Sequence, residues 1–376
     1  MQVQQLSFEP NRGWRERSGD LAGRAPDMVL VFGGRHLLES EQGLESLRAR
    51  FPNARLVMAS TSGEMIGTEV SEDTLSATAV AFDKTRIRCA IARVSGAPDS
   101  YRAGQKLAKD LAAEDLVHVF ALSDGAMVNG TELARGFNEH LPAGPLLTGG
   151  LAGDGTRFER TVVGLDARPA PGQVVAVGFY GRNLHVKVGS AGGWAPFGPV
   201  REVTRSEGNT LFELDGHSAL ALYRTYLGDQ AQQLPASALR FPLSVTPRDS
   251  TQAVVRTILS IDDAAQSMTF AGDIPWGARV RFMRASYEDL IDGAATAAEQ
   301  VRDNGGAQLV VCVSCVGRRI VLGQRTEEET ESVHAVVGDR PILAGFYSYG
   351  ELAPVGSSVA CQLHNQTMTI TSLFEG

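Results

Sequence analysis

The chain has 376 residues, of which 43% are hydrophobic and 21% are charged, a composition typical of a soluble globular protein with room for two or more domains. Its formal net charge of −8 argues against nucleic-acid binding, which relies on clustered basic side chains. No apolar run is long enough to cross a bilayer, residues 1–27 contain no signal-peptide centre, and four cysteines are too few for a disulfide scaffold. We therefore expect a cytoplasmic protein with free thiols and without membrane insertion, and its oligomeric state stays open.

The first part of the chain predicts a polar arm followed by alternating strands and helices. Residues 1–27 are expected to form a flexible arm. Apolar runs and helical spacing then predict a strand at 28–32, a helix at 40–50, strands at 56–59 and 77–82, and a glycine corner at 60–64 between these two strands. The order is strand, helix, strand, corner, strand.

The same order recurs twice. The second copy is expected at 117–122, 131–140, 145–148, the corner 149–154 and 174–180, and the third at 309–315, 326–337, 341–345, the corner 348–351 and 358–363. In the third copy, Thr326 and Glu329 are spaced like a capping box. Each corner places a carboxylate directly after a glycine, at Glu64, Asp154 and Glu351. We interpret this pattern as an internal strand-helix-strand-strand repeat in an α/β protein.

A change in composition marks a boundary near residue 230. A short helix from Ser218 to Gly228 ends the first half, and a stretch rich in Gln, Pro and Ser follows. Beyond it we expect a hairpin around 254–270, a strand at 278–283 and a helix that Ser286 and Asp289 cap. The predicted organisation is therefore two related mixed αβ domains, 28–230 and 231–376, after the arm.

Several ordered motifs resemble the FIST family, a bacterial sensory module with an N-terminal and a C-terminal domain. The resemblance covers roughly residues 28–372. It rests on the segments 59–65, 149–154, 178–180, 255–259, 270–275, 315–318, 345–351 and 364–367.

This resemblance implies a ligand-binding sensor rather than an enzyme. The family was proposed to sense small molecules such as amino acids. A subset is similar to nitric-oxide-sensing haemoproteins that control a histidine kinase or cyclic-di-GMP signalling. Because these 376 residues include no kinase or cyclase segment, the signal is expected to pass to a separate partner protein.

The corners supply most of the predicted ligand-binding residues. Repeated αβ units usually pack with pseudo-symmetry, and a cleft between them is a natural ligand site. Carboxylates there suit a ligand ammonium group, and arginines such as Arg248, Arg256 and Arg318 suit a carboxylate. The alternative is that the carboxylates bind nearby backbone N–H groups. The predicted ligand-binding residues are Ser60, Ser62, Glu64, Asp154, Arg318, Tyr347, Tyr349 and Glu351.

A histidine within the strongest motif is the candidate axial ligand for haem b. His364 follows an apolar strand, and His217 is the second choice. The alternative for His364 is an imidazole hydrogen-bonded to the backbone. Cys312 and Cys315 have metal-site spacing, but a regular strand would point them to opposite faces, so we expect no metal site.

Two other classes of function stay open. One is an enzyme in which Cys315 is the nucleophile and His364 the base, although no Ser-centred nucleophile elbow or zinc-hydrolase motif supports it. The other is a scaffold that binds its partner with or without ligand. The glycine-rich run 149–155 lacks the Gly-Lys-Ser/Thr of a phosphate loop, so nucleotide binding is not expected.

Overall fold

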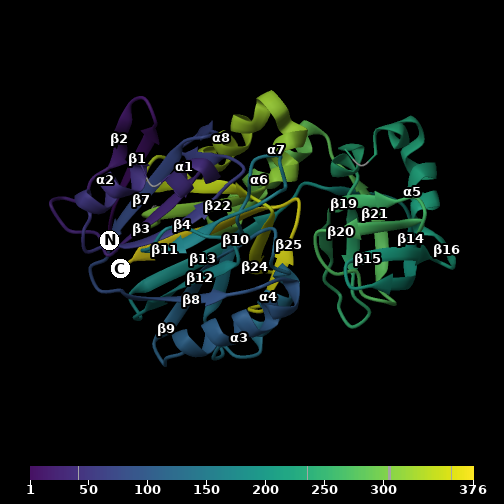
Figure 1. Cartoon of the computed structure of the whole chain (residues 1–376), viewed down its shortest axis with the longest axis horizontal. Coiled ribbons are helices and arrows are strands. Elements are labelled where there is room, and N and C mark those ends of the chain that lie inside the picture. Colours follow the sequence, from purple (N-terminus) through teal and green to yellow (C-terminus); the bar gives the residue numbers. More distant parts are fainter. Residues whose placement is uncertain (41, 235, 304–305, 357) are drawn as a thin grey trace.

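The structure, a computed structural model, describes residues 1–40, 42–234, 236–303, 306–356 and 358–376. It consists of a large body and a smaller lobe that lies to the right of the body in Figure 1. Helices make up 26% and strands 42% of the residues, which confirms the predicted mixed α/β class. No helix in these ranges is long and apolar enough to span a membrane.

The body is built from three six-stranded sheets. Sheet one has the order β11 (Val163–Leu165), β4 (Arg55–Ser60), β3 (Met28–Gly33), β7 (Leu75–Ala81), β1 (Gln2–Glu9) and β2 (Gly13–Gly19). Sheet two has the order β25 (Cys361–His364), β24 (Gly350–Pro354), β10 (Leu146–Leu151), β9 (Leu116–Ser123), β12 (Gln173–Tyr180) and β8 (Arg86–Arg93). Sheet three has the order β13 (Leu184–Ala191), β26 (Met368–Glu375), β22 (Leu309–Cys315), β23 (Ile342–Ser348), β5 (Glu64–Ile66) and β6 (Glu69–Ser71).

The predicted repeat is present three times, once for each sheet, with one correction. The last strand of the third copy is β26, which pairs with β22 as β7 pairs with β3, whereas the strand predicted at 358–363 corresponds to β25 in sheet two. Each sheet contains one parallel pair, β3–β4, β9–β10 or β22–β23. Helices connect these pairs: α1 (Arg35–Ser40) and α2 (Gln42–Arg50), then α4 (Gly130–Asn138), then α7 (Val316–Leu322), the short η4 (Gly323–Arg325) and α8 (Thr326–Val337). After each pair the chain turns at a corner and enters the next sheet as β5, β11 or β24. The three sheets are therefore interlocked in a cycle.

The N-terminal residues are part of this cycle and do not form a flexible arm. β1 pairs antiparallel with β7, as β8 pairs with β12 and β13 with β26. Val3, Leu6 and Phe8 are buried because this strand packs its apolar side chains into the body. The Met1 amino group lies 3.3 Å from the Glu375 carboxylate, so the two chain ends meet (Figure 1).

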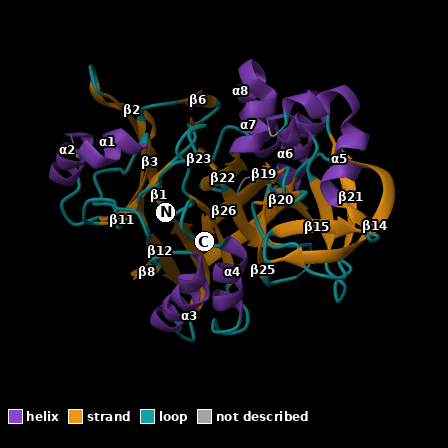
Figure 2. Ribbon diagram, turned by 45° about the vertical axis from the view of Figure 1, so that its right-hand side comes forward, coloured by secondary structure: helices purple, strands orange, loops and turns teal. Residues whose placement is uncertain are grey.

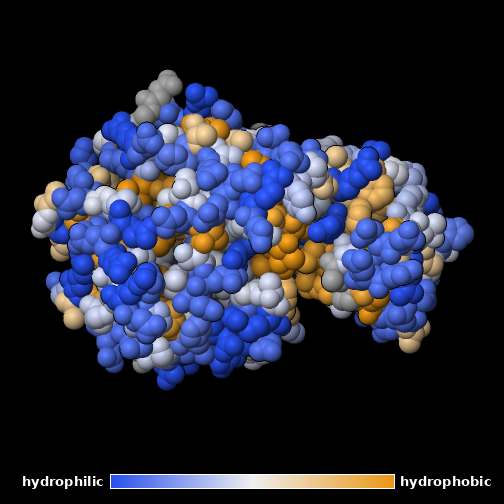
Figure 3. Space-filling view, turned by 90° about the horizontal axis from the view of Figure 1, so that it is seen from above, coloured by the Kyte–Doolittle hydropathy of each residue, from blue (hydrophilic) through white to orange (hydrophobic). Residues whose placement is uncertain are grey.

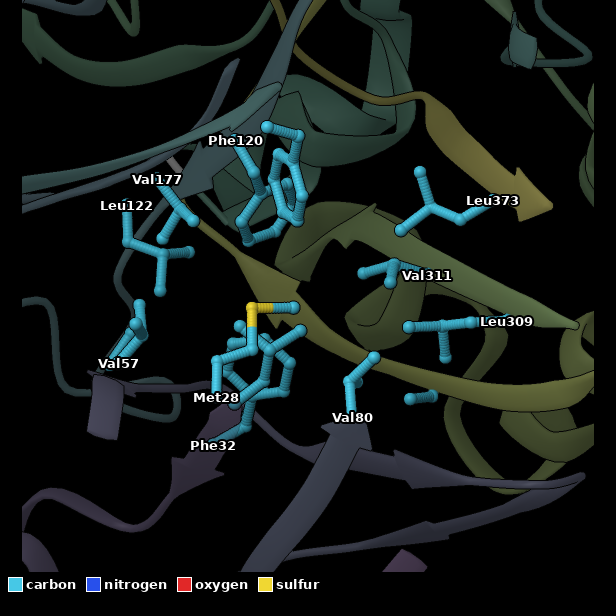
Figure 4. Packing of buried hydrophobic residues seen from close by; sticks show 14 of the residues in the cluster. Met28, Phe32, Val57, Val80, Phe120, Leu122, Val177, Leu309, Val311 and Leu373 are labelled. Carbon is cyan, nitrogen blue, oxygen red and sulfur yellow. The ribbon is translucent and has the colours of Figure 1, made fainter. Parts of the chain in front are cut away.

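Side chains from all three sheets form one central core. Figure 4 shows residues of sheet one, such as Met28 and Phe32, packed against Phe120 of sheet two and Leu309 of sheet three. Helices cover the outer faces of the sheets (Figure 2). α1 and α2 cover sheet one. α3 (Ser100–Leu111), which follows η1 (Ala97–Asp99), covers sheet two with α4, and α6 (Tyr287–Val301) covers sheet three with α8. Ser286 and Asp289 cap α6 as predicted.

The lobe has a core of its own and runs from Ala195 to Arg284. Its strands are β14 (Ala195–Glu207), β15 (Thr210–Leu214), β16 (His217–Ser218), β17 (Leu243–Thr246), β18 (Val254–Arg256), β19 (Ile258–Asp262), β20 (Ser267–Phe270) and β21 (Arg279–Arg284). Its helices are α5 (Ala219–Leu227), η2 (Gly228–Gln233) and η3 (Ala236–Arg240). The predicted domain boundary near 230 falls inside this lobe.

Candidate functional site

The three glycine corners meet where the sheets join. The Ser62 amide donates to the Tyr347 carbonyl at 2.8 Å, and the Tyr349 amide donates to the Leu151 carbonyl at 3.0 Å. The Gly153 amide donates to the Ser60 carbonyl at 2.9 Å. The structure thus brings the predicted corner residues together, but it joins them mainly by backbone hydrogen bonds.

Glu64 is a buried carboxyl group held by two hydroxyls. Thr61 Oγ1 donates to it at 2.5 Å and Thr74 Oγ1 at 2.7 Å. Burial raises the pKa of Glu64 to about 7, because desolvation disfavours the carboxylate more than these hydrogen bonds favour it.

Glu351 repeats this arrangement at the third corner. Ser348 Oγ donates to it at 2.6 Å and Thr367 Oγ1 at 2.8 Å. Burial raises the pKa of Glu351 to about 8. Side-chain hydroxyls therefore hold both carboxyl groups in their corners. At neutral pH each carboxyl group is protonated in a large fraction of the molecules.

Asp154, at the second corner, is held by arginines instead. Its Oδ1 lies 3.1 Å from Arg35 Nε and 2.9 Å from Arg157 Nε, and the residue is fully buried. These ion pairs occupy the carboxylate that the sequence suggested for a ligand ammonium group.

A small polar pocket lies beside the first and second corners. Its volume is about 80 Å³, which is enough for a few water molecules. Ser62 and Glu64 are the predicted residues that line it.

Arg318 and Tyr347 belong to a buried network around Glu329. Arg318 Nε donates to the Glu329 carboxylate at 2.7 Å, and the Tyr347 hydroxyl donates to it at 3.1 Å. Arg318 also donates to the carbonyl of Gly192 at 2.6 Å, on the connection from β13 to β14, and to that of Leu290 at 2.7 Å, in the first turn of α6. The sequence prediction of a capping box from Glu329 to Thr326 is wrong, because Glu329 points inward to Arg318 and α8 has no side-chain cap.

A cleft of about 970 Å³ lies between the body and the lobe. Figure 3 shows hydrophobic residues gathered in this hollow. From the body it is lined by Ala97, Gly125, Ala126, Met127, Val128, Asn129, Gly130, Leu151, Thr156, Phe158, Glu159, Cys315, Val316, Gly317, Ile320, Tyr349, Leu363 and Asn365. From the lobe it is lined by Asn209, Gln233, Leu234, Leu239, Thr257, Ile258, Leu259, Phe270, Ala271 and Gly272.

Comparison with protein families identifies the chain. Residues 27–217 match the FIST N domain, and residues 219–354 match the FIST C domain. The chain belongs to the FIST family. FIST domains are sensory domains that bind small ligands in signalling proteins. No curated protein matches the chain.

Both matched FIST regions contribute to the cleft. Of the predicted ligand-binding residues, Tyr349 lines it, and so does Cys315 from the enzyme alternative. Phe158, Thr257 and Asn365 were missed as site residues. The signal that could have found two of them is the motif itself, because Thr257 lies in the 255–259 segment and Asn365 in the 364–367 segment.

His364 of this FIST protein does not line the cleft. Its Nε2 lies 3.0 Å from the Ala353 carbonyl oxygen, and burial lowers the pKa of His364 to about 4. The imidazole is therefore neutral, and its Nε2–H donates a hydrogen bond to the backbone carbonyl. The residues present do not fit haem ligation by this nitrogen.

The other candidate cation and thiol groups also serve internal contacts. Arg256 donates to the Leu363 carbonyl at 2.8 Å, and Arg248 lies 5.9 Å from the Trp276 ring. Burial raises the pKa of Cys312 and of Cys315, so both stay protonated thiols. Within the described ranges, no group of three His, Cys, Asp or Glu side chains is placed to hold a metal ion.

Proposed function

We propose that this FIST protein is a cytoplasmic sensor that binds a small ligand in the inter-lobe cleft. The observation that carries the proposal is the cleft itself, whose volume of about 970 Å³ is in the range of pockets that enclose small ligands. A separate protein, such as a histidine kinase or a cyclic-di-GMP signalling protein, receives the signal.

Ligand binding between two parts of a protein can change their relative position. A ligand that contacts both body and lobe binds best to the arrangement in which both walls reach it, so its binding shifts the populations of the arrangements. The contacts across the junction that surround the cleft include three hydrogen bonds: Asn129 to Asp273 at 3.1 Å, Arg256 to the Leu363 carbonyl at 2.8 Å, and Gln366 to the Leu239 carbonyl at 3.1 Å.

Helix α7 provides a route from the cleft to the connecting segments. Val316, Gly317 and Ile320 face the cleft, while Arg318 on the same helix binds Gly192 and Leu290. A ligand that moves α7 therefore also moves the hydrogen bonds of Arg318 to Gly192, on one connection to the lobe, and to the first turn of α6, which follows the other connection. This coupling supports a sensor whose lobe reports occupancy of the cleft.

A fluorescent probe tests whether the cleft binds small molecules. Nile red is uncharged and brightens in apolar surroundings, so titration with the protein should give saturable fluorescence. Ala126→Trp places a bulky ring in the cleft and should abolish most of the signal, because Ala126 is an exposed lining residue. Ala49→Trp, at an exposed site on α2, is the matched control. Equal binding by all three proteins would refute the cleft as the site.

Haem and nitric oxide sensing need a separate test. The observation against ligation by His364 is its hydrogen bond to the Ala353 carbonyl. An ultraviolet-visible spectrum of protein expressed with haem precursor, before and after reduction and nitric oxide, decides the matter. A Soret band that shifts with nitric oxide and is lost in His364→Ala supports haem, whereas a featureless spectrum excludes it.

The enzyme alternative is tested at Cys315. Its thiol is 4% exposed, and burial raises its pKa, so it lacks the thiolate character of a nucleophile. We expect Nile red to bind Cys315→Ser as it binds the wild type. Turnover of a thioester or ester that is lost in this variant would support the enzyme instead.

A further inference from the structure

We infer that Phe158 is a ligand-binding residue of the inter-lobe cleft, and that it stacks on the ring of an uncharged, largely apolar ligand. This inference rests on the proposed function, because it assigns the chemical class of the ligand that the cleft binds. It follows from the charge of the lining, from the exposed apolar side chains gathered there, and from the backbone conformation of Phe158.

The lining offers a charged ligand no strong partner. Among the described lining residues, Glu159 is the only one with a charged side chain, and it is exposed to solvent, where an ion pair contributes little. Two buried arginines next to lining residues in the sequence are already engaged, since Arg256 donates to the Leu363 carbonyl and Arg318 pairs with Glu329. A ligand carboxylate or phosphate would lose its water without gaining a positive partner. An anion is therefore a poor ligand.

Polar side chains of the lining are also occupied within the protein. Asn129 uses both ends of its amide, because it accepts from the Thr131 amide at 2.9 Å and donates to Asp273 at 3.1 Å. The Asn365 side-chain oxygen and the Thr257 hydroxyl are buried and present no surface to a ligand. Apolar contact rather than hydrogen bonding to these side chains is therefore the main means of recognition.

Exposed apolar side chains gather in the cleft. Phe158 is 46% exposed, Leu259 on β19 of the lobe is 48% exposed, and Ile320 on α7 of the body is 37% exposed. All three line the cleft, where Figure 3 shows hydrophobic residues on both sides of the hollow. Contiguous apolar surface of this kind marks a binding site, because it is unfavourable to leave in water. An apolar ligand between body and lobe covers it.

Phe158 forms an aromatic platform with Tyr349, which also lines the cleft. The two rings stack with centroids 4.7 Å apart and planes inclined by 18°. The Tyr349 hydroxyl accepts a hydrogen bond from the Phe158 amide at 3.1 Å, so Tyr349 holds both the ring and the backbone of Phe158. A flat ligand ring can extend this stack, because offset-stacked rings attract one another beyond their burial.

The backbone of Phe158 supports a role in binding. Its φ is 55°, in the left-handed region that bulky residues rarely adopt. Such strained conformations cluster at sites that contact ligands, where the surrounding structure holds them in place. At Phe158 a strained backbone exposes an apolar ring, and both features destabilise the free protein. A ligand ring that covers Phe158 removes the second of these penalties.

Displacement of Nile red by three related compounds tests the ligand class. Methyl phenylacetate is uncharged and aromatic, phenylacetate carries a carboxylate, and methyl cyclohexylacetate is uncharged with a saturated ring. We expect phenylacetate to bind about 10-fold more weakly than methyl phenylacetate, or worse. Phe158→Leu should weaken methyl phenylacetate about 5-fold relative to methyl cyclohexylacetate, because only the aromatic ring loses a stacking partner. This ratio cancels the difference in hydrophobicity between the two esters.

Further variants separate stacking from folding. Trp276→Leu removes an exposed aromatic ring that does not line the cleft and should leave the ratio unchanged. Phe158→Gly tolerates the positive φ, so it should fold and lose the same 5-fold ratio if Phe158→Leu does not fold. Ala22→Gly, at an exposed position with φ of 51°, is its matched control.

The outcomes distinguish this inference from the proposed function. Phenylacetate that displaces Nile red as well as its methyl ester, methyl phenylacetate that fails to displace it, or a ratio unchanged in the Phe158 variants would overturn the inference. Saturable binding of Nile red to the wild type would still support the cleft as a ligand site in each of these cases. Absence of Nile red binding would instead refute the cleft itself.

Discussion

Replacement of Glu351 by glutamine should make the protein less sensitive to alkaline pH. In the folded state burial raises the pKa of Glu351 from 4.5 to about 8. The folded protein therefore keeps a proton that the unfolded chain has already lost, so stability is complete below about pH 4.5 and falls as the pH rises toward about 8. Glutamine resembles the protonated carboxyl group and cannot ionise.

The size of this effect follows from the two pKa values. Relative to low pH, ionisation of Glu351 in the unfolded chain lowers the free energy of unfolding by about 1 kcal/mol at about pH 5 and by about 4 kcal/mol at about pH 8. The stability of Glu351→Gln relative to the wild type should therefore improve by about 3 kcal/mol across this interval. Urea denaturation at both pH values measures it.

Two further variants serve as a comparison and a control in this experiment. Glu64→Gln removes the equivalent carboxyl group of the first corner and should give a smaller change in the same direction, because the pKa of Glu64 is raised only to about 7. Glu45→Gln, at an exposed position on α2, should give no pH-dependent change. A stability difference between Glu351→Gln and the wild type that is the same at both pH values would show that Glu351 is ionised in the folded protein.

Two further changes probe the junction of body and lobe. Glu329→Gln leaves its fully buried arginine partner without a counter-charge and should cost about 3 to 5 kcal/mol in urea denaturation, whereas Glu331→Gln, exposed on the same helix, should cost almost nothing. Gly193→Ala should lower the free energy of unfolding by about 2 kcal/mol or more, because its Cβ would lie 1.8 Å from the Asp289 carbonyl oxygen. Gly208→Ala has a similar positive φ but open space, so an equal loss there would argue against the contact.

Much of the body could be predicted because its repeat is local. Each unit has an apolar strand, a helix, a second strand and a glycine followed by a carboxylate within a short stretch of chain. Side-chain periodicity and the freedom of glycine act at this range, and the capped start of α6 at Ser286 was recognised for the same reason. The family motifs lie at these same positions.

Pairing between distant segments could not be predicted in this way. β1 becomes a core strand only because β7 lies beside it, and the lobe is closed by β14 and β21, whose residues are about eighty positions apart. No local signal encodes such a partner. The corner carboxyl groups illustrate the same limit, because Glu351 meets Thr367 only after β24 and β26 have taken their places in different sheets.

The sequence alone determined the α/β class, the threefold repeat and the FIST family, since each depends on patterns within short segments. Tertiary structure alone decided which polar groups face one another and which face a cavity. It placed Glu64, Asp154, Glu351 and His364 in internal hydrogen bonds or ion pairs, and it opened the cleft at Tyr349 and Asn365. A cleft is the space between two surfaces, and its lining depends on how body and lobe dock, which no single segment specifies.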